Sequence, residues 1–124
     1  MTVRSYQELI AWQKAMDLVQ SVYELVRAFP KEEIYGLTSQ LKRAAVSVPS
    51  NIAEGLGREH TREFINHLSI ARGSLYEAET QVLIAERRKY IGPDQVHAAL
   101  ELSSEVARMI HGLIQALERK MQGS

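Results

Sequence analysis

Residues 37–55 read LTSQLKRAAVSVPSNIAEG, and this stretch decides the fold. Its apolar positions recur at helical spacing, yet Pro49 stands near the end of the run. A proline inside a helix removes a backbone hydrogen bond and crowds the carbonyl four residues back, at a cost of about 3 kcal/mol. We therefore expect a helix that kinks at Pro49, with the Asn51 amide bonding backbone groups at the disturbed turn or in the following loop. Gly55 and Gly57 predict the helix end, since glycine tolerates the left-handed conformation of a C-cap.

Four segments of helical periodicity cover the chain, separated by short breaks. The first runs from Ser5 to Phe29, and the second starts after Lys31-Glu32-Glu33 and ends at Gly55 and Gly57. The third opens at Thr61, its expected cap, and runs to Lys89, and the fourth has Pro93 in its first turn. Short links make neighbouring helices antiparallel. Residues 1–124 therefore predict one all-α domain, an up-down-up-down antiparallel four-helix bundle.

The apolar stripes of these segments differ in width. The third segment has one unbroken seam, which contains Leu68, Leu75 and Val82. The first segment has two adjacent stripes, and we expect both to belong to a broad apolar face: Trp12, Met16, Val19, Tyr23 and Val26 form one, and Ala15, Leu18, Val22, Leu25 and Phe29 the other. The fourth segment is similarly double. A bundle helix needs an apolar face of about three positions in seven. The excess predicts an intersubunit surface in a cyclic oligomer, with deep burial inside the monomer as the alternative.

Composition and motifs argue against several kinds of chemistry. The chain has no cysteine, so disulfides, thiol catalysis and thiolate metal sites are excluded. The Glu-x-x-His pairs of di-metal bundles and the spacing of a P-loop are missing as well, so we expect no metal, no cofactor and no enzymatic activity. No apolar run approaches the ~20 residues of a membrane span, and the N-terminus lacks the apolar core of a signal peptide, which favours a cytoplasmic protein.

The basic residues are the remaining candidates for a binding site. Formal net charge is zero, and a neutral chain weakens any expectation of non-specific nucleic-acid binding. A local patch can still contact phosphate without reading bases. The residues that would form it are Lys42, Arg43, Arg58, Arg62 and Arg72. The alternative interpretation is scattered, solvated surface charge.

Four ordered sequence blocks resemble a bacterial four-helix-bundle family, first noticed as proteins encoded within intervening sequences of 23S ribosomal RNA genes. The blocks are LIAWQKAM at 9–16, GLTSQLKRAA at 36–45, VPSNIAEG at 48–55, and the region from Glu63 to Gln81. Pro49, Asn51 and Gly55 lie in the third block and form its structural signature. The resemblance implies a homopentamer around a central channel. Relatives include accessory proteins of diversity-generating retroelements, which look like basic pentamers that engage nucleic acid and a reverse transcriptase.

Two functions follow as hypotheses. The first is a non-enzymatic oligomeric bundle that acts as an accessory factor for RNA or DNA, or for a ribonucleoprotein. The second is a structural or protein-interaction module that binds no nucleic acid. Clustering of the five basic residues on one face would favour the first, and an exposed apolar groove would favour the second.

Overall fold

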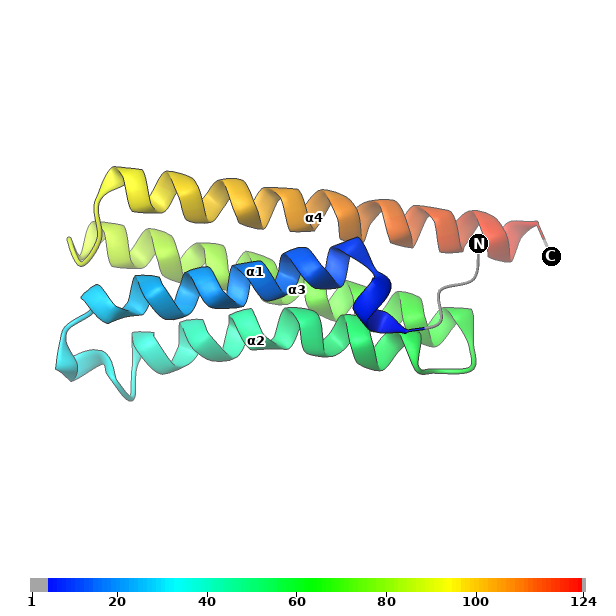
Figure 1. The fold of residues 1–124 in the computed structure, drawn as a ribbon, viewed down its shortest axis with the longest axis horizontal. Helices are drawn as coiled ribbons and strands as arrows, with labels where there is room; N and C mark the ends of the chain where they lie inside the picture. The colour runs from blue at the N-terminus through cyan, green and yellow to red at the C-terminus, as the bar shows by residue number, and fades with distance from the viewer. Residues whose placement is uncertain (1–4, 124) are drawn as a thin grey trace.

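The computed structural model describes residues 5–123, and these residues confirm the predicted all-α class (Figure 1). Four α-helices occupy Ile10–Leu25 (α1), Leu37–Leu56 (α2), Thr61–Arg87 (α3) and Pro93–Gln122 (α4). Three single-turn 3-10 helices lie at Tyr6–Glu8, Val26–Ala28 and Lys31–Glu33. Within residues 5–123 there is no strand.

The four helices enclose one core. α1 packs against α2 and α4, and α3 packs against the same two helices from the other side. Figure 1 shows the chain reversing its direction at each connection, so that the α1–α2 and α3–α4 connections lie at the same end. The contact between α2 and α3 is the most extensive of the bundle.

The predicted seam of α3 is confirmed. Leu68, Leu75 and Val82 are all buried, and they meet buried residues of the other three helices, among them Ile52 and Ile110. An uninterrupted apolar stripe at 4-3 spacing on a long helix has a single favourable orientation, which is toward the core.

The two apolar stripes of the first helix are not buried to the same extent, so burial inside the monomer does not account for all of the excess. Ala15, Leu18 and Val22 are buried, whereas Met16 and Tyr23 of the other stripe are 43% and 44% exposed. Both stripes are apolar enough to be buried, but a helix of a four-helix bundle contacts only two neighbours. Met16 and Tyr23 therefore stay on the outer surface of the monomer, whereas Val26 of the same stripe is buried.

The predicted start of the second helix also needs correction. Residues Lys31–Glu33 form a separate 3-10 turn, and α2 begins only at Leu37, after Gly36. The Glu33 carboxylate accepts a hydrogen bond from the Leu37 backbone N–H through Oε1 at 3.0 Å. It therefore satisfies one of the unpaired N–H groups at the start of α2.

The glycines at the end of α2 do not form the predicted left-handed cap. Gly55 lies inside the helix, and Gly57 is the C-cap with an ordinary right-handed φ of −74°. At the α2–α3 connection, the N-cap of α3 is His60 rather than the predicted Thr61. At the α3–α4 connection, α3 ends at Arg87 rather than at Lys89, and α4 begins at Pro93 as predicted. Among the described residues the left-handed conformation occurs outside glycine at Lys89, where φ is 64°.

Candidate nucleic-acid interface

The signature residues of α2 build a polar bridge to α3. The Asn51 side-chain amide donates to the Ser47 carbonyl at 2.9 Å and to Ser47 Oγ at 3.0 Å. Its carbonyl oxygen lies 3.0 Å from His67 Nδ1 on α3. Since Asn51 presents an acceptor there, His67 must carry its proton on Nδ1. The Ser47 and Ser74 hydroxyls meet at 2.8 Å, which adds a second link between the helices. The predicted backbone role of Asn51 is confirmed.

Pro49 lies in the same turn, within a helix that is continuous on both sides of it. Proline has no N–H to donate, so the Ala45 carbonyl loses its usual helical partner. Neighbouring carbonyls gain side-chain donors instead, because Ser50 Oγ bonds the Val46 carbonyl at 2.8 Å and Asn51 bonds that of Ser47. The kink at Pro49 stays a prediction.

Gly55 allows α2 and α3 to approach closely below this bridge. A Cβ atom at this position would lie 2.7 Å from His67 Cβ and 2.9 Å from Phe64 Cδ1. Both distances are below ordinary van der Waals contact, so glycine is required here for packing rather than for a turn. The signature therefore functions as a helix–helix contact.

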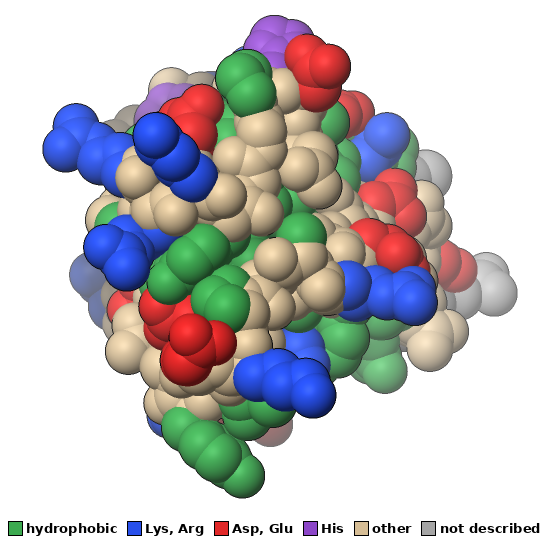
Figure 2. Space-filling model, turned by 90° about the vertical axis from the view of Figure 1, so that its left-hand side faces the viewer, with side chains coloured by type: hydrophobic (Ala, Val, Ile, Leu, Met, Phe, Trp, Pro, Cys, Tyr) green, Lys and Arg blue, Asp and Glu red, His purple; other side chains and the backbone are tan. Residues whose placement is uncertain are grey.

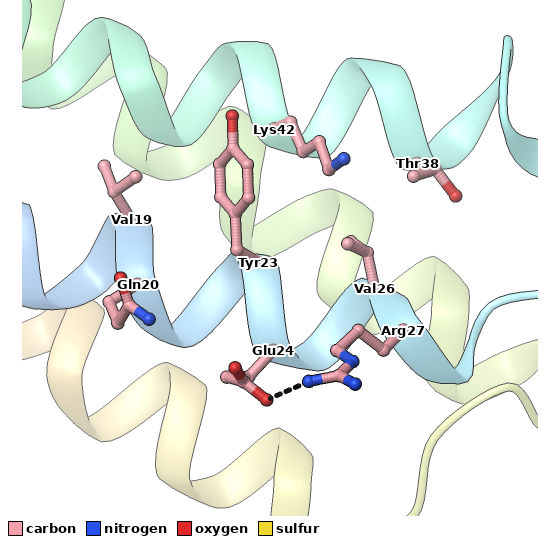
Figure 3. Close-up of a pocket in the computed structure, with 8 residues that line it drawn as sticks. All are labelled: Val19, Gln20, Tyr23, Glu24, Val26, Arg27, Thr38 and Lys42. Atoms are coloured by element: carbon pink, nitrogen blue, oxygen red, sulfur yellow. Dashed lines mark hydrogen bonds and ion pairs between the residues drawn. The ribbon is translucent and has the colours of Figure 1, made fainter.

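Lys42, the first of the five predicted basic residues, lies in a groove of about 570 Å³ between α1 and α2 (Figure 3). Its ammonium group lies 4.8 Å from the ring centroid of Tyr23, within cation–π range. In the same groove Arg27 pairs with Glu24 at 3.4 Å. Lys42 therefore has an aromatic partner in this groove, Tyr23. The charge of Arg27, the other cation of the groove, is offset by the Glu24 carboxylate.

Arg43 and Arg72 lie in two other grooves. Arg43 lines a hollow of about 330 Å³ between α2 and α3, next to Ser47, Ser74 and the buried Gln81. Arg72 lines a groove of about 630 Å³ between α3 and α4. Adjacent helical positions such as 42 and 43 point about 100° apart, which places their side chains in different grooves.

Arg58 and Arg62 lie at the opposite end of the bundle from the α1–α2 connection, where α2 meets α3. Arg58 pairs with Glu54 at 2.9 Å and lies 3.9 Å from Glu63, so carboxylates offset much of its charge. Arg62 is exposed. The structure therefore distributes the five predicted residues over three grooves and one connection of the monomer.

The end that carries the α1–α2 and α3–α4 connections has mixed charge. Figure 2 views this end, where Lys and Arg side chains are interspersed with Asp and Glu side chains. Glu33 is fixed here: its Oε2 accepts from the Tyr90 hydroxyl at 2.8 Å, in addition to the bond from Leu37 N–H. Both hydrogen bonds stabilise the carboxylate and hold the pKa of Glu33 below its usual value, and the bond from the Leu37 N–H has the larger effect. Arg88 lies over the Tyr90 ring, 5.9 Å from its centroid.

Two residues of the α3–α4 groove, an arginine and a histidine, were not among the five predicted from the sequence. Arg108 and His111 of α4 line the same groove as Arg72. They are more than thirty positions from Arg72, and the only local signal is their own spacing of three, which puts both on one helix face.

Residues 5–123 contain no group of three His, Cys, Asp or Glu side chains placed to hold a metal ion. Over the same residues, no helix combines the length and apolar character of a membrane span.

The four helices and the close contact between α2 and α3 define a protein of the four-helix, all-α class. This chain belongs to the 23S rRNA-intervening sequence protein family, whose sequence model matches residues 7–112. It is also similar in structure to a protein of unknown function from the S23 ribosomal protein family of Bacteroides thetaiotaomicron, with a TM-score of 0.79 and 22% identity. That similarity covers 85% of this chain and 98% of the Bacteroides chain, and it concerns the fold. No curated protein matches the chain significantly.

Proposed function

We propose that this protein is a non-enzymatic subunit of a cytoplasmic cyclic homo-oligomer, an up-down-up-down bundle that contacts RNA or DNA through its basic residues. The observation that carries the assembly is a set of exposed apolar side chains on α1. Ile10 is 60% exposed, and Met16 and Tyr23 of the same helix are also largely exposed. Met16 and Tyr23 are seven positions apart and share one face of α1, and an exposed apolar face marks an interaction site.

A second apolar feature continues this surface toward α4. Ile10 and Ala11 line a groove of about 410 Å³ together with Met109, Gly112 and Leu113. A cyclic ring repeats one heterologous interface around its axis, so a stripe on one subunit must meet a different surface on the next. The α1 stripe and the α1–α4 groove supply two such surfaces, and the family resemblance favours five subunits.

Light scattering at micromolar concentration tests the assembly. A mass of about five times the 14.0 kDa of one chain is expected. A mass near that of one chain would overturn the ring. Met16→Glu should then reduce the oligomer, whereas Asp17→Ser, at the exposed neighbouring position outside both apolar stripes, should leave the mass unchanged.

We assign the nucleic-acid contact to Arg58 and Arg62 because they are the two of the five dispersed basic residues that lie together, although Glu54 and Glu63 offset part of the charge of Arg58. A ring multiplies a weak patch, and avidity can exceed the affinity of one site by about 10²–10⁴ without new contacts. Binding should weaken steeply with salt, because each phosphate contact releases counterions. It should favour the length or structure of the nucleic acid over its sequence.

A polarisation titration with structured RNA and duplex DNA at ~50 mM salt tests this contact, since low salt favours electrostatic binding. Arg58→Gln combined with Arg62→Glu should abolish binding without altering the oligomer. Arg87→Gln combined with Arg119→Glu makes the same change in charge at two exposed arginines outside the α2–α3 connection, and this matched control should bind normally. An assembled wild-type protein that binds neither nucleic acid would favour the protein-interaction module, for which the apolar groove is the relevant surface.

A further inference from the structure

The groove between α3 and α4 combines cationic, aromatic and apolar side chains. α3 contributes Arg72, Tyr76 and Glu79, which are spaced four and three apart and share one helix face. The side chains from α4 are Leu100, Ser104, Ala107, Arg108 and His111. Its volume of about 630 Å³ is within the range of small-molecule sites.

One hydrogen bond fixes how the two helices face each other. Ser103 Oγ donates to Glu79 Oε2 at 2.6 Å. Because α3 and α4 run in opposite directions, positions before Glu79 face positions after Ser103 (Figure 1). Arg72 precedes Glu79 by about 11 Å of helix, and His111 follows Ser103 by about 12 Å. These two residues therefore lie at the same level, with Arg108 one turn closer to the Glu79 end.

The groove is consequently polarised along its length. Its far end holds two guanidinium groups and an imidazole, and among residues 5–123 no ion pair joins any of these three to a carboxylate. Arg108 donates to the Ser104 hydroxyl at 3.0 Å, a neutral partner that leaves its charge uncompensated. At the other end, the Glu79 carboxylate is engaged by Ser103.

The middle of the groove is suited to a flat, apolar group. Tyr76 lies between Arg72 and Glu79 in the sequence of α3 and is 55% exposed. Ala107, four positions after Ser103, lines the groove from α4 at the level of Tyr76. An aromatic side chain beside a cationic groove is the arrangement on which unpaired bases stack, because every base has a π-face.

We propose that this groove binds one nucleotide unit, with its phosphate at Arg72, Arg108 and His111 and its base against Tyr76. The proposal rests on the nucleic-acid function proposed above and assigns to it an unpaired nucleotide as the ligand. A free mononucleotide presents the same phosphate and base. Glu79 repels a second phosphate at the opposite end, so the groove takes one nucleotide and does not extend along a strand.

The test compares groove variants with a matched control on the same two helices. The groove variants are Arg72→Gln with Arg108→Gln, and separately Tyr76→Leu. The control is Arg87→Gln with Arg119→Gln, because both arginines are outside the groove and are not buried. The probes are a fluorescent single-stranded RNA of about six nucleotides, read by polarisation, and unlabelled adenosine and uridine 5′-monophosphates, read by NMR titration.

The arginine variant should weaken RNA binding at least tenfold and lower the salt slope by about 0.7, the value for one phosphate contact on a single strand. Tyr76→Leu should weaken it at least fivefold through lost stacking. The control should change affinity less than twofold. Mononucleotide binding that is lost in the groove variants, with strand binding unaffected, would support the site and identify a free nucleotide as its ligand.

Other results would overturn the assignment. If the groove variants bind both probes like wild type while Arg58→Gln with Arg62→Glu abolishes binding of structured RNA, the groove assignment is wrong and the proposed function stands. The groove assignment is equally wrong if wild-type protein binds structured RNA but neither the short strand nor a mononucleotide. An assembled protein that binds none of these would overturn both proposals.

Discussion

Replacement of Gly55 by alanine sets two effects of opposite sign against each other. Alanine in a helix interior is favoured over glycine by about 1 kcal/mol. The added methyl group, however, would lie 2.7 Å from His67 Cβ and 2.9 Å from Phe64 Cδ1. His67 Cβ is one bond from the backbone and cannot move without shifting α3. Overpacking of this kind costs about 1–3 kcal/mol, so we expect a net destabilisation of up to about 2 kcal/mol.

Gly73 provides the matched control. It lies inside α3, and a Cβ atom there would meet nothing within 4 Å. Gly73→Ala should therefore stabilise the protein by about 0.5–1 kcal/mol. Urea unfolding at one fixed protein concentration measures both variants, because the stability of an oligomer depends on concentration. The two free energies of unfolding should differ by about 1–3 kcal/mol.

A stabilisation of Gly55→Ala equal to that of Gly73→Ala would refute the close approach of α2 and α3. A double-mutant cycle gives a second readout. Phe64→Ala removes one of the two short contacts, so Gly55→Ala should be less harmful in that background, by about 1 kcal/mol. Additive effects would mean that the ring of Phe64 does not restrict Gly55.

Four further predictions follow from other elements. Leu75→Ala should cost about 2–5 kcal/mol in denaturant unfolding, and a change within about 0.5 kcal/mol would mean that the seam of α3 is misassigned. Asn51→Ala should cost about 1–3 kcal/mol, because it leaves His67 Nδ1 without its acceptor between the helices; equal stability at neutral pH would contradict the bridge. The lowered pKa of Glu33 contributes stability that is present above the usual carboxyl pKa and is lost as pH falls through the lowered value. Thermal unfolding should therefore show Glu33→Gln less stable than wild type at pH 7, with a difference that shrinks below about pH 4; a constant difference would exclude titration of Glu33 as the cause. Lys89→Gly should raise the unfolding temperature, since glycine relieves about 1–2 kcal/mol of left-handed strain at φ 64°, and a lower temperature would show that the lysine side chain matters more.

The candidate interface was only partly predictable from the sequence. Basic residues can be identified one by one, but Lys42 and Arg43 are neighbours in the chain that line different grooves. Arg72 and Arg108 are distant in the chain and line the same groove. Lys42 and Arg43 line different grooves because they point in different directions from α2. Arg72 and Arg108 line the same groove because α3 packs on α4. The first effect follows from local helix geometry, whereas the second depends on how two helices pack, which spacing alone does not reveal.

The sequence by itself determined the all-α class, the approximate extent of the four helices and the buried seam of α3. Each of these depends on local periodicity and on proline and glycine punctuation, which act within a few turns of helix. The burial of individual α1 positions depends instead on packing, because Leu18 and Met16 belong to stripes of similar apolar character and the positions of the neighbouring helices select between them. The same holds for Gly55. Its sequence context is that of a helix end, and the need for glycine arises from the side chains of His67 and Phe64, which only the packed α2–α3 pair brings within 3 Å of an added Cβ.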